Sequence, residues 1–188
     1  MILFPLYSFP DDALRHPEFF AGLARETNAW ILAATYIPQT PGESITRGFF
    51  DAALLYSPEG KLVDYYQAVQ APPFRQVSEY NQAQYKILAT PFGNLGILLC
   101  YEDSVPKMAQ RAVEKGADIL IALSNPGHFT ATWMPHYHFM QDRLRAIESG
   151  RFVVRASSNG YSGVIDPKGR ILKRTNLNQQ QILTIEVG

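Results

Sequence analysis

Short apolar runs alternate with segments of helical periodicity along most of this chain, and the alternation restricts the fold more than any other feature. The run 117–124, for example, has the length and composition of a buried strand. The segment 135–149 instead has a helical pattern that ends at Gly150. Strands that alternate with helices in this way predict an α/β fold.

The same pattern places the individual elements. We expect helices near residues 16–28, 104–115 and 135–149. We expect the main strands near residues 30–37, 50–56, 94–100, 117–124, 151–157 and 182–187, with shorter strands at 62–66, 162–165 and 170–173. Residues 68–85 are rich in proline and glutamine and lack a period, so they predict a surface loop.

Composition limits the class of function. The chain has 188 residues, 46% of them hydrophobic, which suits a single domain over 1–188. Its 17 basic and 17 acidic residues form no block of like charge, which argues against a nucleic-acid partner. No apolar run approaches the roughly 18 residues that a membrane helix needs, and residues 1–9 lack the basic start of a signal peptide. We therefore expect a soluble domain with no membrane span in this chain.

The only cysteine lies where an apolar strand ends and acidic residues begin, in the stretch GILLCYED at 96–103. Between a strand and a helix, Cys100 would lie in the crevice where open α/β sheets bind ligands, and the helix amides would favour its thiolate. The alternative is a small buried hydrophobe that continues the apolar set Leu95, Ile97 and Leu99. Position alone leaves both interpretations open.

Several short motifs follow one another in a fixed order. They are CYE at 100–102, GAD at 116–118, SN at 124–125, RLRAIESGR at 143–151, SNG at 158–160 and DPKGR at 166–170. This ordered set resembles the carbon–nitrogen hydrolase (nitrilase) superfamily, and within it the apolipoprotein N-acyltransferase branch. The resemblance implies an αββα sandwich with mixed sheets, apparently lacking the family's first strand and helix.

The resemblance also implies chemistry in which a cysteine thiolate attacks an amide, nitrile or ester carbonyl. In that family a glutamate takes the thiol proton, and a lysine stabilises the oxyanion together with the backbone amide after the cysteine. Carried over to this chain, the nucleophile is Cys100 and the amide is that of Tyr101. Leu6 stands at the glutamate position and Gln67 at the lysine position. Only the cysteine of the triad is therefore retained.

Two carboxylates remain as substitutes for the missing base. Glu102 follows the cysteine by two residues, where the acyltransferase branch also has an acid, and Glu79 lies in the predicted loop. Glu102 is thus a tentative catalytic residue. The alternative is a solvated carboxylate that favours the start of the following helix.

The resemblance assigns support of the pocket to Asn125, His138 and Glu148. For Glu148 the alternative is an ordinary helix pair with Arg145. His136 and His138 are two residues apart, and such residues on a helix point to different faces. We therefore expect no metal, and no motif indicates a cofactor.

Two classes of function follow. The chain is a thiol-dependent amide hydrolase or N-acyltransferase acting on a small acyl or amide substrate, with weak or lost activity. Alternatively, it binds such a ligand or another subunit without turnover, and a homodimer is one such assembly. If the chain belongs to a full acyltransferase, we expect it at the periplasmic face of the inner membrane.

Overall fold

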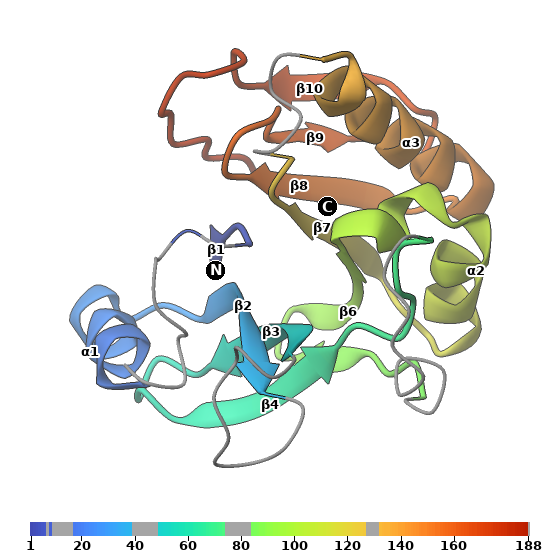
Figure 1. Cartoon of the computed structure of the whole chain (residues 1–188). Coiled ribbons are helices and arrows are strands. Elements are labelled where there is room, and N and C mark those ends of the chain that lie inside the picture. The colour runs from blue at the N-terminus through green and yellow to red at the C-terminus, as the bar shows by residue number, and fades with distance from the viewer. Residues whose placement is uncertain (7, 9–16, 39–48, 74–83, 127–131, 188) are drawn as a thin grey trace.

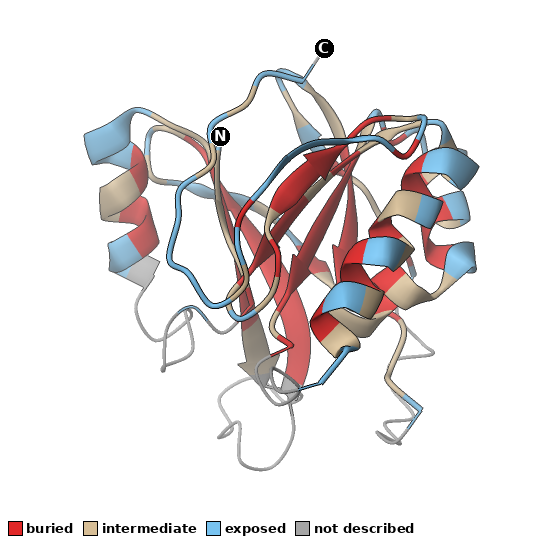
Figure 2. Ribbon diagram, turned by 90° about the horizontal axis from the view of Figure 1, so that it is seen from above, coloured by how far each residue is buried: buried red, intermediate tan, exposed pale blue. Residues whose placement is uncertain are grey.

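Two β-sheets stack face to face between helices in the computed structural model of the chain (Figures 1 and 2). The structure describes residues 1–6, 8, 17–38, 49–73, 84–126 and 132–187. Buried residues concentrate on the sheets and on the inward sides of the helices (Figure 2). The αββα sandwich expected from the sequence is therefore confirmed.

The first sheet contains four strands in the order β1-β2-β3-β4. Their bounds are Ile2–Phe4, Ile31–Pro38, Phe49–Tyr56 and Leu62–Gln67. β1 runs parallel to β2, and the other pairs are antiparallel. Helix α1 (Pro17–Thr27) covers the outer face, where Phe20 and Ala24 pack against Leu54 and Tyr56.

The second sheet contains six strands in the order β10-β9-β8-β7-β6-β5. In chain order, β5 to β10 span Leu88–Thr90, Gly93–Leu99, Ile119–Ser124, Phe152–Ser157, Gly163–Ile165 and Ile171–Arg174. The central strands β6, β7 and β8 are parallel, and the flanking pairs are antiparallel. Helices α2 (Pro106–Glu114) and α3 (Met134–Ser149) cover its outer face (Figure 1).

Alternation along each strand divides the side chains between the two faces of a sheet. On β3, Ala53 and Leu55 belong to the central core between the sheets, whereas Leu54 and Tyr56 belong to the core under α1. The central core is the larger of the two, and Cys100 packs against it. The face on which a residue lies therefore decides whether its side chain is turned toward the cysteine.

The predicted helices and most predicted strands agree with the structure within about two residues. One predicted strand is wrong, because residues 182–187 form no strand and Ile182 is 95% exposed. Among the described residues, the predicted loop 68–85 has no regular structure, but Ala68, Val69 and Tyr85 in it are buried. Alternation of apolar residues alone does not supply the partner strand that 182–187 would need.

The predicted helix 104–115 begins later than expected. A 3-10 turn, η3 (Cys100–Ser104), separates β6 from α2, and Val105 occupies the helix N-cap. No helix in the described part of the chain is both long and apolar enough to cross a membrane.

Helix α2 approaches β6 so closely that Gly96 leaves no room for a side chain. A Cβ atom there would lie 2.7 Å from Cβ of Ala112 and 2.8 Å from Cδ2 of Leu120. We predict that Gly96→Ala lowers the free energy of unfolding by about 1–3 kcal/mol through overpacking. Gly22→Ala on α1 is the control, because no atom lies within 4 Å of its added Cβ. That variant should gain about 0.5–1 kcal/mol, and equal urea-denaturation midpoints for the two variants would contradict the close packing.

Candidate active site

Cys100 is the first residue of the turn η3 and is partly buried. Its backbone has φ of 50°, in the left-handed region. That conformation costs an L-residue about 1–2 kcal/mol and persists only where the surrounding structure holds it. The two residues that follow Tyr101, Glu102 and Asp103, are both buried and hold the turn from opposite sides.

Glu102 attaches the turn to the first sheet. Its side chain is fully buried, and both carboxylate oxygens accept a hydrogen bond from the Tyr66 hydroxyl at 3.0 Å. Oε1 also accepts from the amides of Val69 at 2.8 Å and Gln70 at 3.2 Å, and Oε2 accepts from the Leu99 amide at 2.9 Å. The interpretation of Glu102 as a solvated carboxylate is therefore wrong, because the side chain is a buried link between sheets.

Asp103 attaches the turn to the second sheet and α3. Its carboxylate is 2.7 Å from Nδ1 of His138 and accepts a hydrogen bond from Nη1 of Arg155 on β8 at 2.8 Å. The Ser104 hydroxyl donates to the same carboxylate at 2.8 Å. Nη1 of Arg145 donates to the Asp103 carbonyl at 3.2 Å. His138 is thus linked to the turn through Asp103, and its role in supporting the pocket remains a prediction.

Arg155 extends this buried cluster by two more contacts. Its Nη1 also donates to Oδ2 of Asp142 on α3 at 2.8 Å, and Nη2 donates to the Ser124 hydroxyl. Arg155 and Asp142 are both almost completely buried. The cluster therefore places two carboxylates on one guanidinium group inside the protein.

Burial and neighbouring charges shift the pKa values of these acids in different directions. Burial raises the pKa of Glu102 to about 7, although its five hydrogen bonds oppose the rise. Burial also raises the pKa of Asp142 to about 6, against the attraction of Arg155. For Asp103, burial is outweighed by the hydrogen bonds and charges of His138 and Arg155, and its pKa is lowered. Asp103 is therefore ionised at neutral pH.

The Cys100 thiol does not have the lowered pKa that the sequence predicted. Burial and the negative charges of Asp51 and Asp103 raise its pKa to about 12, while the Tyr101 amide and Arg155 act in the opposite direction. The expectation of activation by the helix amides is wrong, since η3 lies between Cys100 and the first residue of α2. The hydrogen bond from the Tyr101 amide to the sulfur lowers the thiol pKa, and the role of this amide toward an oxyanion remains a prediction.

The strand register shows which residues of β3 and β4 are turned toward Cys100. Tyr66 is opposite Ala53, and both belong to the central core, whereas Gln67 is opposite Ala52 and therefore lies on the other face. The Ala68 amide donates to the Asp51 carbonyl at 2.8 Å, which continues the ladder by one pair.

Asp51 and Ala68 thus lie on the Cys100 side of the sheet, and both are buried. Ala68 therefore shares the central-core face with Tyr66, whereas Gln67 lies on the other face, and the assignment of Gln67 to the family's lysine position remains a prediction.

Leu6 lies in the central core and is fully buried. Its carbonyl accepts a hydrogen bond from the Ser158 hydroxyl at 2.7 Å, which joins the segment after β1 to the end of β8. Beyond β7, Nδ2 of Asn159 donates to Oδ1 of Asn125 at 2.9 Å. These contacts join the segment of residue 6 to that of residue 158, and the segment of residue 125 to that of residue 159.

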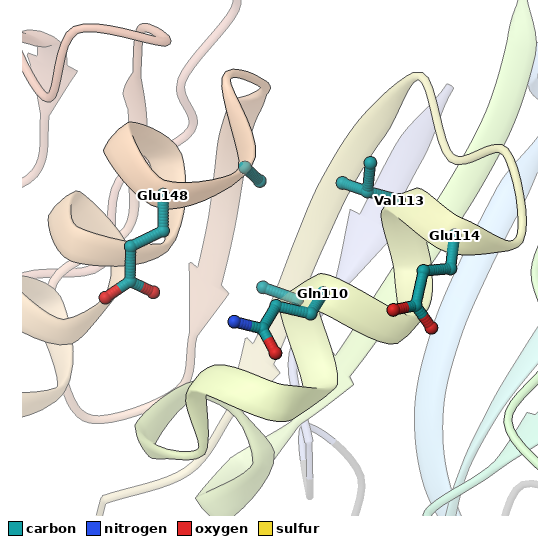
Figure 3. A pocket seen from close by; sticks show the side chains of 6 residues that line it. Gln110, Val113, Glu114 and Glu148 are labelled. Carbon is teal, nitrogen blue, oxygen red and sulfur yellow. The ribbon is translucent and has the colours of Figure 1, made fainter.

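Glu148 lies in a surface groove between α2 and α3 (Figure 3). The groove has a volume of about 220 Å³ and is lined by Ala109, Gln110, Val113, Glu114, Glu148 and Ser149. Glu148 pairs with Arg145 at 2.9 Å, so the helix-pair interpretation is confirmed. Because Arg145 also holds the Asp103 carbonyl, Glu148 reaches the turn only through that arginine.

The sequence matches the carbon–nitrogen hydrolase family over residues 9–188. The chain belongs to the carbon–nitrogen hydrolase family. Among curated proteins, it is 27% identical over 201 residues to an apolipoprotein N-acyltransferase of Geobacter metallireducens, covering 97% of this chain and 38% of that protein. An apolipoprotein N-acyltransferase of Synechocystis is 32% identical over 97 residues, covering 52% of this chain and 18% of that protein. The chain thus spans well under half the length of these relatives.

Solved structures show the same fold. The carbon–nitrogen hydrolase of Helicobacter pylori has a TM-score of 0.74 at 18% identity, with 89% of this chain and 65% of that chain covered. An amidase from Nesterenkonia sp. has a TM-score of 0.68 at 21% identity, with 88% and 64% covered. A glutamate-to-leucine variant of that amidase carries the acetamide moiety of fluoroacetamide on its active-site cysteine, also with a TM-score of 0.68.

Sequence analysis of this family member missed three charged residues of the site. Asp51 and Arg155 each interrupt an apolar strand, and Asp142 lies on the buried side of α3. A charge within a buried strand is a detectable signal, because it requires a partner there. The predicted alternative base Glu79 and the histidine His128 lie outside the described residues.

We predict that the free energy of unfolding decreases as pH rises from about 4 to 6. Folded Asp142 has a pKa of about 6, above the 3.8 of an exposed aspartate, so over this range the folded state holds a proton that the unfolded state has lost. Asp142→Asn should remove about 1–3 kcal/mol of this decrease. Urea titrations of the unmodified protein and of Asp142→Asn at pH 4.5 and 7 test this prediction. It is contradicted if the free energy of unfolding changes by the same amount between the two pH values in both proteins.

We predict that Glu102→Gln lowers the free energy of unfolding by about 2–4 kcal/mol at pH 7. The hydrogen bonds to the carboxylate all come from donors, so the new amide nitrogen would leave either the Leu99 N–H or the Val69 and Gln70 N–H groups without an acceptor. The exposed Glu114→Gln is the control and should change stability by less than about 0.5 kcal/mol. Comparable thermal midpoints for the two variants would show that Glu102 does not link the sheets.

Proposed function

We propose that this domain binds a small acyl or amide ligand at Cys100 and that the thiol accepts an acyl or alkyl group without efficient turnover. The observation that supports this proposal is the pair Leu6 and Ala68. Both are buried in the central core against which Cys100 packs. We take them to stand at the places where the family's chemistry requires a carboxylate and a cation. The backbone of the nucleophile turn, including the Tyr101 amide at the sulfur, is nevertheless present.

The missing groups would reduce turnover strongly. Loss of one oxyanion donor costs about 10²–10³ in rate, and loss of general-base help costs about 10²–10⁴. A thiol with a pKa of about 12 is also ionised to only about 1 part in 10⁵ at pH 7. Glu102 does not replace the base in this proposal, because its carboxylate is fully used in holding the turn.

The relatives supply the chemical class of the ligand. The curated relatives are named apolipoprotein N-acyltransferases, and the Nesterenkonia structures are of an amidase, so acyl and amide groups are the common chemistry. The adduct on the glutamate-to-leucine amidase variant supports fluoroacetamide as a probe for a cysteine of this fold. We accordingly propose fluoroacetamide and an activated ester as test reagents for Cys100.

We predict that restoring the two charged groups increases acylation only at the positions turned toward the cysteine. Leu6→Glu combined with Ala68→Lys should acylate from p-nitrophenyl acetate at least about tenfold faster than the unmodified protein, since the paired charges supply a base and an oxyanion donor. Leu6→Glu combined with Gln67→Lys is the matched control and should stay at background, because residue 67 lies on the outer face. Intact-mass spectrometry measures the adduct, which must disappear in Cys100→Ala.

The proposal fails if the unmodified protein turns over the ester as fast as the first double variant acylates, or if the Gln67 variant is the faster one. Far-UV circular dichroism establishes that each variant is folded. If the Ala68 variant does not fold, alkylation of the native protein by fluoroacetamide decides. An adduct that forms only after unfolding would show that Cys100 is a core residue and that no ligand reaches it.

A further inference from the structure

In the buried cluster behind the Cys100 turn, two carboxylates share the single guanidinium group of Arg155. Nη1 of Arg155 donates at 2.8 Å both to Oδ2 of Asp103 and to Oδ2 of Asp142. The second terminal nitrogen, Nη2, is directed to Ser124. One guanidinium nitrogen therefore donates to two carboxylates. A stronger hydrogen bond to Asp142 weakens the bond that the same nitrogen makes to Asp103.

The two carboxylates are not equally satisfied. Asp103 also has contacts from His138 at 2.7 Å and from the Ser104 hydroxyl at 2.8 Å. Asp142 has only the bond to Arg155 on Oδ2, and within the described part of the chain its buried Oδ1 has no hydrogen-bond partner. A buried carboxylate with one bonded oxygen is the member of the cluster that most readily takes a proton.

Asp103 is the member of the cluster that lies beside the cysteine. It follows Cys100 by three residues in the same turn, and its charge opposes the thiolate, while Arg155 favours it. How fully Arg155 neutralises Asp103 therefore affects the thiol. The other charged groups around the cysteine are Asp51 on β3 and Glu102 in the turn.

We propose that Asp142 is a positioning residue that acts on Cys100 through Arg155. When Asp142 is ionised it shares the guanidinium group, so the charge of Asp103 beside the thiol is only partly neutralised. When Asp142 is neutral, Arg155 binds Asp103 alone, which holds the turn more firmly and favours the thiolate. The inference rests on the proposed function only in taking Cys100 as the nucleophile, and the raised pKa of Asp142 is consistent with it.

The test is the rate of Cys100 alkylation by fluoroacetamide between pH 5 and 9, measured by intact mass on the full chain. Asp142→Asn keeps the shape of the side chain and removes its charge. We expect alkylation at pH 7.5 to become about threefold to tenfold faster, which corresponds to a fall of half to one unit in the thiol pKa. An inflection near pH 6 in the unmodified protein should disappear in the variant.

A second variant separates charge from simple loosening of the fold. Arg155→Gln removes the cation and should slow alkylation, whereas Asp142→Asn accelerates it. Loosening alone would accelerate both, because both changes would expose the thiol. Glu114→Gln on the outer face of α2 removes one surface charge and should leave the rate within about twofold.

The inference is overturned if Asp142→Asn leaves the rate and the pH profile within twofold of the unmodified protein, or if both cluster variants shift the rate in the same direction. If Arg155→Gln does not fold, the pH profiles of the other two proteins still decide. Alkylation needs neither a restored base nor an oxyanion donor. An effect of Asp142 on alkylation without ester acylation in the Leu6→Glu, Ala68→Lys variant would therefore retain this inference and reject the assignment of those two positions in the proposed function.

Discussion

The hydrogen bonds of the Glu102 carboxylate join the two sheets at the point where the Cys100 turn begins. They connect the end of β6 to Tyr66 on β4 and to the backbone after that strand. A buried carboxylate is stable only when its oxygens are supplied with donors, so the position of the loop after β4 is fixed by the same contacts. Without this link, the residues turned toward Cys100 from the first sheet would have no defined distance to the turn.

Asp103 completes the hold on the turn from the opposite side. Its contacts to His138, Arg145 and Arg155 tie the turn to α3 and β8, which are the parts of the chain that carry the family's later motifs. Two buried acids on adjacent residues, Glu102 and Asp103, thus hold the turn in which Cys100 has its left-handed backbone conformation. Asp103, one of the two acids that hold the turn, also places negative charge beside the Cys100 sulfur and raises the pKa of the thiol, so support of the turn and ionisation of the thiol are opposed.

Much of the fold could be predicted from the sequence, because the helices and central strands have strong periodicity. The segment 182–187 shows the limit, since a strand also needs a partner that periodicity does not name. The position of Cys100 at the end of a strand was predictable, but its ionisation was not. That property depends on Asp51, which is distant in the sequence and reaches the site only through the register of β3. The face on which Gln67 lies was not predictable for the same reason, since a shift of one residue reverses the face of a strand.

The left-handed conformation of Cys100 also determines which residues this position can accept over evolutionary time. A β-branched side chain such as valine or threonine is strongly disfavoured at positive φ, whereas glycine and asparagine adopt it readily. A chain that loses its thiol should therefore drift toward small or amide side chains and keep the backbone of the turn. The backbone shape of the turn would then be kept even where the thiol is lost. A descendant with another side chain at position 100 would still present the Tyr101 amide to the group that replaces the sulfur.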